Sequence, residues 1–324
     1  MATTAVAVLH CGLLTLREAF LSARRRRYSV SPTLVAAAIA ATLLAACDPA
    51  SRTPDTASLG IDDFGDTIRP PALATRIVSL NPTTTEILFA LGAGPRLVGR
   101  THYDKYPDSA RLVPDLGPGI RPNVEAVLAA RPDLVLLYAS SDNRAAAVTL
   151  RAAGIATVGF KVDRIEQFDA ATRLLGRIIG DSARGALVAD TVKRTLDSAR
   201  ALTAGLPRPT VVLPAWDSPL LVIGGGSFMT QLVEAAGGRN IYDTEASPSP
   251  GVAFEDIVRR DPDYVLVGPE SAARLRRQGK WRALRAVREG RMLIIDTMVT
   301  LRPATRLGEG ALSLVRLLHP GVLK

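Results

Sequence analysis

The sequence repeats one helix-to-strand unit, as VEAVLAARPDLVLL at residues 124–137 and, without gaps, as FEDIVRRDPDYVLV at residues 254–267. Each copy has a glutamate at the start of a short helical stretch, a Pro-Asp pair that ends the helix, and an apolar run typical of a buried strand. A second pair, EILFALG at residues 86–92 and QLVEAAG at residues 231–237, occurs in the same order. Two ordered repeats predict two similar α/β lobes.

The segment between the repeats predicts one long helix. From Asp181 to Ala204, apolar residues recur at helical spacing and no proline interrupts them. At ~1.5 Å per residue this helix would be about 36 Å long, enough to cross from one lobe to the other. One further peripheral helix is the alternative interpretation. We predict an α/β fold with an N-terminal lobe at residues 75–162, a bridging helical segment at 163–205 and a C-terminal lobe at 206–324.

The first lobe is predicted to open with a strand that feeds a helix. RIVSL at residues 76–80 is a short β-branched run. Thr83 and Glu86 have the spacing of a capping box, and Gly92 is placed to end the helix. Further strands are predicted at residues 96–99, 134–138, 155–160, 210–214, 220–223, 264–267 and 292–295.

The amino terminus predicts an export signal. LVAAAIAATLLAA at residues 34–46 lies between four arginines at 24–27 and Cys47. At ~1.5 Å per helical residue it is too short for a ~30 Å hydrocarbon layer. LAAC at residues 44–47 resembles a bacterial lipobox, so we predict a lipoprotein signal peptide at 1–46 and lipidation of Cys47. An ordinary buried thiol is the alternative for Cys47.

Two further expectations concern the ends of this signal. Residues 1–23 are long for the start of a signal peptide, which a misassigned start codon would explain. Residues 47–74 are rich in Pro, Ser, Thr, Asp and Gly without a sustained apolar period. We therefore predict a flexible tether there.

The composition excludes a disordered chain and does not favour nucleic acid as a partner. Of 324 residues, 47% are apolar, enough for a large core. The net charge is +9, but loss of residues 1–46 lowers it to +5, an ordinary value for a solvated surface. Cys11 and Cys47 are the only cysteines, so no disulfide is expected after the signal is removed.

Motifs for metal binding and catalysis are missing from the sequence. His102 and His319 are the only histidines after the signal, too few for a dedicated bare-metal site. Gly224-Gly225-Gly226-Ser227 has no phosphate-loop spacing and is interpreted as a turn before a helix cap. No nucleophile elbow occurs. We expect no enzyme and no cofactor, with hydrolysis by a hidden pair of carboxylates as the minor alternative.

Several stretches together resemble the helical-backbone metal-receptor family of substrate-binding proteins of ABC importers. They are RIVSLNPTTTEILFALGAGPRLVGRTHYDKYP (76–107), the two Glu-to-Pro-Asp units, GGGSFMTQLVEAAGGRNI (224–241) and RPATRLGEGALSLVRLLHP (302–320). The resemblance covers roughly residues 75 to 320. It implies two Rossmann-like α/β lobes joined by one long backbone helix, the class III periplasmic-binding-protein fold, with limited closure on the ligand.

The resemblance also implies site residues. In the cobalamin-binding branch of the family, the ligand lies between the lobes, and the positions that match ligand contacts are Tyr103, Trp216, Arg302 and Arg306. The glutamates that dock on the permease match Glu125 and Glu255. One acid on each lobe suits two separate contacts with arginines of a symmetric partner. The alternative is that each acid only favours its helix amino terminus, worth about 0.3 to 1 kcal/mol.

Some family positions differ in this sequence. A tryptophan of cobalamin receptors matches Gly119, an aspartate and a second tryptophan fall near Met298 and Val299, and the iron-binding tyrosine of haem receptors falls near Pro118. His102 beside Tyr103 is either a ligand contact or a solvated loop residue.

The resemblance therefore implies an extracytoplasmic lipoprotein that captures cobalamin or a related corrinoid, with haem or a ferric siderophore as the alternative. We expect a monomer held by its lipid at the outer face of the inner membrane, partnered by an ABC permease and its ATPase subunits.

Overall fold

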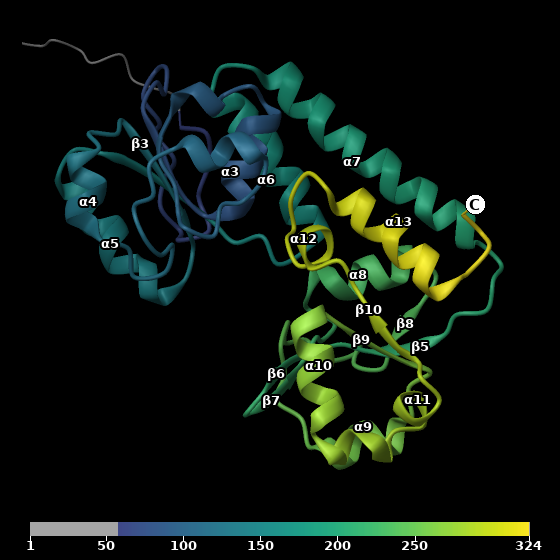
Figure 1. Ribbon diagram of the computed structural model, residues 1–324. Helices are drawn as coiled ribbons and strands as arrows, with labels where there is room; N and C mark the ends of the chain where they lie inside the picture. Colours follow the sequence, from purple (N-terminus) through teal and green to yellow (C-terminus); the bar gives the residue numbers. More distant parts are fainter. Residues whose placement is uncertain (1–57, 324) are drawn as a thin grey trace, which may run out of the picture. The chain divides into compact units, whose positions relative to one another are not determined.

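The computed structural model describes residues 58–323 (Figure 1). The predicted signal peptide at 1–46, the predicted lipidation site Cys47 and the first part of the predicted tether lie outside this range. Both lobes belong to one compact unit. Within residues 58–323, every helix is too short or too polar to cross a bilayer.

The first lobe is built on a parallel sheet with strand order β2-β1-β3-β4. Its strands are short apolar runs that helices cover, as expected for a parallel sheet. The strands are β1 (Ile77–Leu80), β2 (Leu97–Gly99), β3 (Leu134–Tyr138) and β4 (Ala156–Phe160). The helices are α3 (Pro82–Ala90), α4 (Val124–Ala129) and α5 (Ser141–Ala152), with the 3-10 turns η2 (Gly94–Arg96) and η3 (Asp108–Leu112).

The second lobe repeats this plan. Its parallel sheet has the order β10-β9-β5-β8, and an antiparallel hairpin, β6-β7, follows β5. The strands are β5 (Thr210–Val212), β6 (Pro214–Asp217), β7 (Leu220–Val222), β8 (Arg239–Asn240), β9 (Tyr264–Val267) and β10 (Met292–Ile294). The helices are α8 (Phe228–Ala235), α9 (Phe254–Arg260), α10 (Pro269–Arg277), α11 (Arg285–Arg288), α12 (Thr297–Thr300) and α13 (Leu307–Leu318), with the 3-10 turn η4 (Gly279–Ala283).

The strand orders confirm that the sequence repeats are structural repeats. When the strands of each four-stranded sheet are counted in chain order, the first strand is flanked by the second and the third, and the fourth lies beyond the third. The two Pro-Asp aspartates make equivalent contacts. Asp133 accepts hydrogen bonds from the backbone N–H and hydroxyl of Thr75, at 2.8 Å each. Asp263 accepts the corresponding pair from Thr210, at 2.9 and 2.8 Å. Each repeat therefore uses its aspartate to hold the start of the neighbouring strand.

The predicted long helix is confirmed as α7 (Ser182–Thr203), which follows α6 (Ile165–Ile178). Helix α7 packs on α6, on α8 and on α13 (Figure 1). Near its start, Nε of Arg184 donates to the carbonyl oxygen of Ala90 on α3 at 3.0 Å, so α7 contacts both lobes. At the crossing of α6 and α7, Gly176 faces Gly185: a Cβ on Gly176 would lie 2.8 Å from the Cα of Gly185. The absence of both side chains lets the two helices meet backbone to backbone.

One hydrophobic core continues through both lobes. A single cluster of buried side chains includes Ile87 and Leu136 of the first lobe, Leu196 of α7, and Leu213 and Leu314 of the second lobe. The bridging helix is thus part of the core, to which its central and C-terminal turns contribute apolar contacts.

The prediction of a flexible tether is wrong for residues 58–74. Ile68 is only 1% exposed, and the buried carboxylate of Asp62 accepts a hydrogen bond from the backbone N–H of Gly159 at 2.9 Å. Asp66 pairs with Arg144 and Arg151, both on helix α5. A composition typical of a loop concealed these specific contacts, which fix the segment on the edge of the first sheet.

The sequence also misplaced one helix cap and missed two strands. The N-cap of α3 is Asn81, whose side chain accepts from the N–H of Thr83, and not Thr83 itself. Strand β6 begins at a proline and β8 has only two polar residues, so neither has the apolar pattern that reveals a strand.

The glycine contact between α6 and α7 yields a stability prediction. Alanine normally stabilises a helix interior over glycine by roughly 0.5–1 kcal/mol. Here we expect Gly176→Ala to lower the free energy of unfolding by about 1–3 kcal/mol, because the methyl group forces the helices apart. Urea denaturation measures the change. Ser198→Ala on the exposed side of α7 is the control, expected to stay within about 0.5 kcal/mol; equal behaviour of the two variants would contradict the close contact.

Candidate functional site

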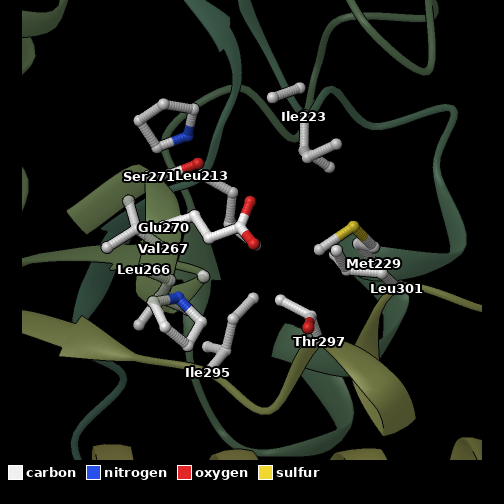
Figure 2. Close-up of a pocket in the computed structure, with 14 residues that line it drawn as sticks. Leu213, Ile223, Met229, Leu266, Val267, Glu270, Ser271, Ile295, Thr297 and Leu301 are labelled. Carbon is white, nitrogen blue, oxygen red and sulfur yellow. The ribbon is translucent and has the colours of Figure 1, made fainter. Parts of the chain in front are cut away.

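The candidate ligand pocket lies at the carboxyl ends of β5 and β9. Its cavity of about 610 Å³ is lined by the residues that follow these two strands, among them Pro214 and Gly268 (Figure 2). After β5 the next strand of the sheet is β8, and after β9 it is β10. These two strands lie at opposite edges of the sheet. Such a reversal of direction opens a crevice at the strand ends, the usual ligand site of an open α/β sheet.

The wall of this pocket is mostly apolar, with a few polar groups on one side. The apolar side chains are Leu213, Ile223, Met229, Leu266, Val267, Ile295 and Leu301. Glu270 and Ser271 of α10 and Thr297 of α12 supply the polar side chains, and Figure 2 shows the Glu270 carboxylate reaching into the space. An apolar surface with a few placed polar groups is typical of a small-molecule site.

The charge of the pocket is set by Glu270 alone. No Lys, Arg, His, Cys or Tyr is among its lining residues, and Glu270 has no ion-pair partner in the part of the chain that the structure describes. A carboxylate without a nearby cation repels anionic ligands and accepts hydrogen bonds from N–H donors. The pocket therefore favours a neutral ligand that carries hydrogen-bond donors. Its lining residues offer no imidazole, thiolate or phenolate ligand to an iron atom.

The four ligand residues predicted from the sequence lie outside the lining of this pocket. Tyr103 is 55% exposed on the loop after β2, where its ring lies 4.0 Å from that of His102. Trp216 is 59% exposed on β6, directly after the pocket residue Ala215. Arg302 lies half-buried between α12 and α13. For these three residues, ligand contact stays a prediction.

The loop that carries Tyr103 is held by a buried carboxylate. Asp104 is 1% exposed and accepts hydrogen bonds from the N–H of Thr101 at 2.8 Å and from the hydroxyl of Thr85 on α3 at 3.0 Å. Burial raises the pKa of Asp104, an effect that these hydrogen bonds and the positive charge of Arg302 partly offset. The position of Tyr103 thus depends on its neighbour Asp104, which no sequence motif indicates.

Arg306 is held by interactions within the protein. Its Nη2 lies 3.2 Å from Oε2 of Glu86 and its Nε lies 3.3 Å from Oε1, while the hydroxyl of Thr305 donates to the same carboxylate at 2.7 Å. The guanidinium carbon lies 3.7 Å from the ring centroid of Tyr106. Arg306 is therefore engaged by a buried carboxylate and an aromatic ring and is not among the lining residues of this pocket; its contact with a ligand stays a prediction.

This ion pair joins the two lobes directly. Glu86 lies on α3 of the first lobe and Arg306 precedes α13 of the second, and their side chains are only 2% and 10% exposed. The interpretation of Glu86 as part of a capping box is wrong, because its carboxylate binds Arg306 and the N-cap of α3 is Asn81. The signal that could have revealed it is the glutamate inside the apolar run EILFAL, because a charged residue in a buried helix face needs a partner.

The two predicted docking acids occupy equivalent positions. Glu125 and Glu255 are the second residues of α4 and α9, both are exposed, and neither forms an ion pair within residues 58–323. The neighbouring Asp256 behaves differently: burial raises its pKa, but hydrogen bonds from Tyr242 and Arg260 outweigh burial and lower it. Asp256 is thus a structural acid, whereas the two glutamates remain available to a partner.

The glycine-rich turn before α8 has a packing role. A Cβ on Gly225 would collide with the carbonyl oxygen of Asp243, so the turn is glycine because another backbone segment lies against it. Ser227 is the N-cap of α8, as predicted. Gly119 is similarly crowded by the carbonyl oxygen of Leu80, which leaves no room there for the tryptophan of cobalamin receptors.

Residues 58–323 contain no group of three or more His, Cys, Asp and Glu arranged to hold a metal ion.

The interlobe ion pair yields a second stability prediction. Arg306→Met leaves the Glu86 carboxylate buried without a partner, and we expect the free energy of unfolding to fall by about 3–5 kcal/mol. The double variant Glu86→Leu, Arg306→Met removes both charges and should recover most of this loss. Arg316→Met, at an exposed position of α13, is the control. A double variant as unstable as the single one would contradict a direct interaction.

Comparison with known proteins places the chain in a family. The sequence profile of the periplasmic binding protein family matches residues 77–298. The vitamin B12-binding protein of Yersinia pestis (strain Pestoides F) is 27% identical over 198 residues, which cover 61% of this chain and 71% of that protein.

Two solved structures share the fold. The periplasmic vitamin B12-binding protein BtuF of Vibrio cholerae superposes with a TM-score of 0.66 at 21% identity, over 76% of this chain and 96% of that one. The periplasmic heme-binding protein RhuT from Roseiflexus sp. RS-1 has a TM-score of 0.68 at 24% identity, over 75% and 99%. With two repeated α/β lobes, one bridging helix and a pocket at the strand ends, this chain belongs to the periplasmic binding protein family.

Proposed function

We propose that this protein captures cobalamin or a related corrinoid outside the cytoplasm and delivers it to an ABC permease. The family supports a periplasmic binding protein that serves an importer. The relatives from Yersinia pestis and Salmonella paratyphi A are both named vitamin B12-binding proteins. The proposal goes beyond these likenesses in its choice of ligand, which rests on the chemistry of the pocket.

The observation that carries the choice of ligand is the single uncompensated carboxylate of Glu270 in an apolar pocket. A corrinoid has a flat apolar ring edged with neutral amides, whose N–H groups can donate to Glu270 and to the hydroxyls of Ser271 and Thr297. Haem has two carboxylates, which Glu270 would repel, and the lining residues supply no imidazole, thiolate or phenolate to its iron.

The second candidate is haem or a ferric siderophore. The fold of the heme-binding protein from Roseiflexus is as similar as that of the B12-binding protein, and the exposed Tyr103 offers a phenol on the loop after β2. The negative charge of Glu270 in the pocket repels the carboxylates of haem, so we rank this candidate second.

The proposed ligand can be tested with purified protein. We expect cyanocobalamin to bind tightly and haemin weakly in isothermal titration calorimetry. Glu270→Gln should weaken cyanocobalamin binding by about tenfold, since hydrogen bonds to a charged acceptor are worth roughly 1.5–3 kcal/mol. Glu234→Gln, an exposed acid on α8, is the control. Tight haemin binding with cyanocobalamin no better than millimolar would reject the corrinoid and select the second candidate.

Delivery to the permease would use the two exposed acids. Glu125 and Glu255 lie at matching positions of the repeated units, so a pseudo-symmetric pair of contacts suits a permease built from two equivalent halves. No catalytic role is proposed for any residue, and the ATPase subunits supply the energy for transport. Lipidation of Cys47, attachment to the outer face of the inner membrane and a monomeric state belong to the same proposal.

The docking role yields a prediction in cells. Charge reversal by Glu125→Lys with Glu255→Lys should abolish corrinoid-dependent growth, because the introduced lysines then repel the arginines of the partner. Ligand affinity of the purified variant should be unchanged. Glu234→Lys with Glu309→Lys, two exposed acids elsewhere, should leave growth intact. Loss of ligand affinity in the first variant would place its acids in folding or in the ligand site.

A further inference from the structure

Positive charge is concentrated on one stretch of the second lobe. Residues 274–291 contain eight basic side chains and one acid. This local excess is larger than the net charge of +5 that remains after residue 46. The stretch forms the end of α10, the turn η4 and helix α11. Neither the ligand pocket nor the docking acids use it.

Five of these basic side chains are exposed and lack an ion pair. Arg274 pairs with Asp217, Arg285 with Asp261 and Asp263, and Arg291 with Glu289. The remaining five have no carboxylate within 4.0 Å among residues 58–323, and we call them the basic face: Arg276, Arg277, Lys280, Arg282 and Arg288. Crowded like charges repel one another, so the arrangement costs stability unless an anion binds there.

The basic face surrounds a second cavity. Arg276, Arg282 and Arg288 line a space of about 480 Å³ together with Leu275, Trp281, Val287, Gly290 and Met292. No acidic residue lines it. Arg288 is fixed in place, since its Nη1 donates to the carbonyl oxygens of Ala283 at 2.7 Å and Arg282 at 3.1 Å. The cavity thus combines guanidinium groups at its rim with an apolar floor.

We propose that this cavity binds the phosphate-bearing headgroup of an anionic phospholipid. Guanidinium groups recognise phosphate oxygens in a fork geometry, and an exposed cluster of them is attracted to an anionic membrane. The space is several times larger than one phosphate ion needs, and the half-buried Val287 offers an apolar surface to the glycerol backbone. A free inorganic anion would leave that floor unused.

The location of the basic face agrees with contact at a membrane. Trp281 packs edge-on against Phe254, with ring centroids 5.2 Å apart, and Nζ of Lys280 lies 5.5 Å from the same ring. Phe254 directly precedes Glu255, so the basic face adjoins the acid proposed to touch the permease. The lipid proposal relies on the proposed docking role of Glu255 only to place the basic face near a membrane. It does not depend on which ligand the pocket at β5 and β9 binds.

The test follows Trp281, which is 1% exposed and lines the cavity. The full chain, labelled with 5-fluorotryptophan in neutral detergent, gives one fluorine NMR signal for each of its two tryptophans, assigned with Trp216→Phe. Dihexanoyl phosphatidylglycerol should shift the Trp281 signal saturably, whereas dihexanoyl phosphatidylcholine and inorganic phosphate should not. Arg276→Glu with Arg282→Glu should weaken this binding at least about tenfold, while Arg194→Glu with Arg239→Glu, an equal charge change elsewhere, should not.

Three results would overturn the proposal. Equal affinity for inorganic phosphate would reject a lipid site in favour of a general anion site. Undiminished phosphatidylglycerol binding in the Arg276, Arg282 variant would place the lipid elsewhere. A variant that keeps lipid binding but no longer associates with the permease would assign the basic face to a protein partner. Cyanocobalamin affinity, measured on the same variants, separates failure of this site from failure of the proposed function.

Discussion

The buried ion pair between Glu86 and Arg306 is the constraint on which the relation of the two lobes depends. Removing either charge from water costs several kcal/mol, and only close contact with the partner and the added hydrogen bond from Thr305 offset that cost. The pair therefore forms in one relative position of α3 and the segment before α13. Together with the continuous core along α7, it favours lobes that move little when a ligand binds.

The position and the polarity of the ligand pocket follow from the strand order of the sheet and from the residues at its strand ends. The order β10-β9-β5-β8 makes the chain leave the sheet in opposite directions after β5 and β9, and the pocket lies where they diverge. Its apolar wall comes from residues at the strand ends and on covering helices, while α10 contributes its one charge, Glu270. Arg306 is paired with Glu86 and is not among the lining residues, so no cation of the lining offsets the negative charge of Glu270.

The outer surface of the second lobe separates charges of opposite sign over a short distance. Glu255 lies at the start of α9, and the basic face lies next to it across the contact between Phe254 and Trp281. A surface that presents an acid and a cluster of arginines side by side suits two partners at once, a basic protein and an anionic bilayer.

The sequence alone determined the repeated architecture and the long bridging helix, because apolar period, Pro-Asp breaks and an uninterrupted helical pattern are local properties of the chain. It also placed Glu125 and Glu255 at exposed helix starts, since their positions follow from the same repeats. Only the tertiary structure decided the partners of the charged residues. Glu86 and Arg306 are 220 residues apart, Asp62 reaches Gly159, and Arg276, Arg282 and Arg288 come together around a cavity on three short elements. The partner of a charged side chain depends on which distant residues the fold brings near it, and local sequence patterns contain no information about those residues.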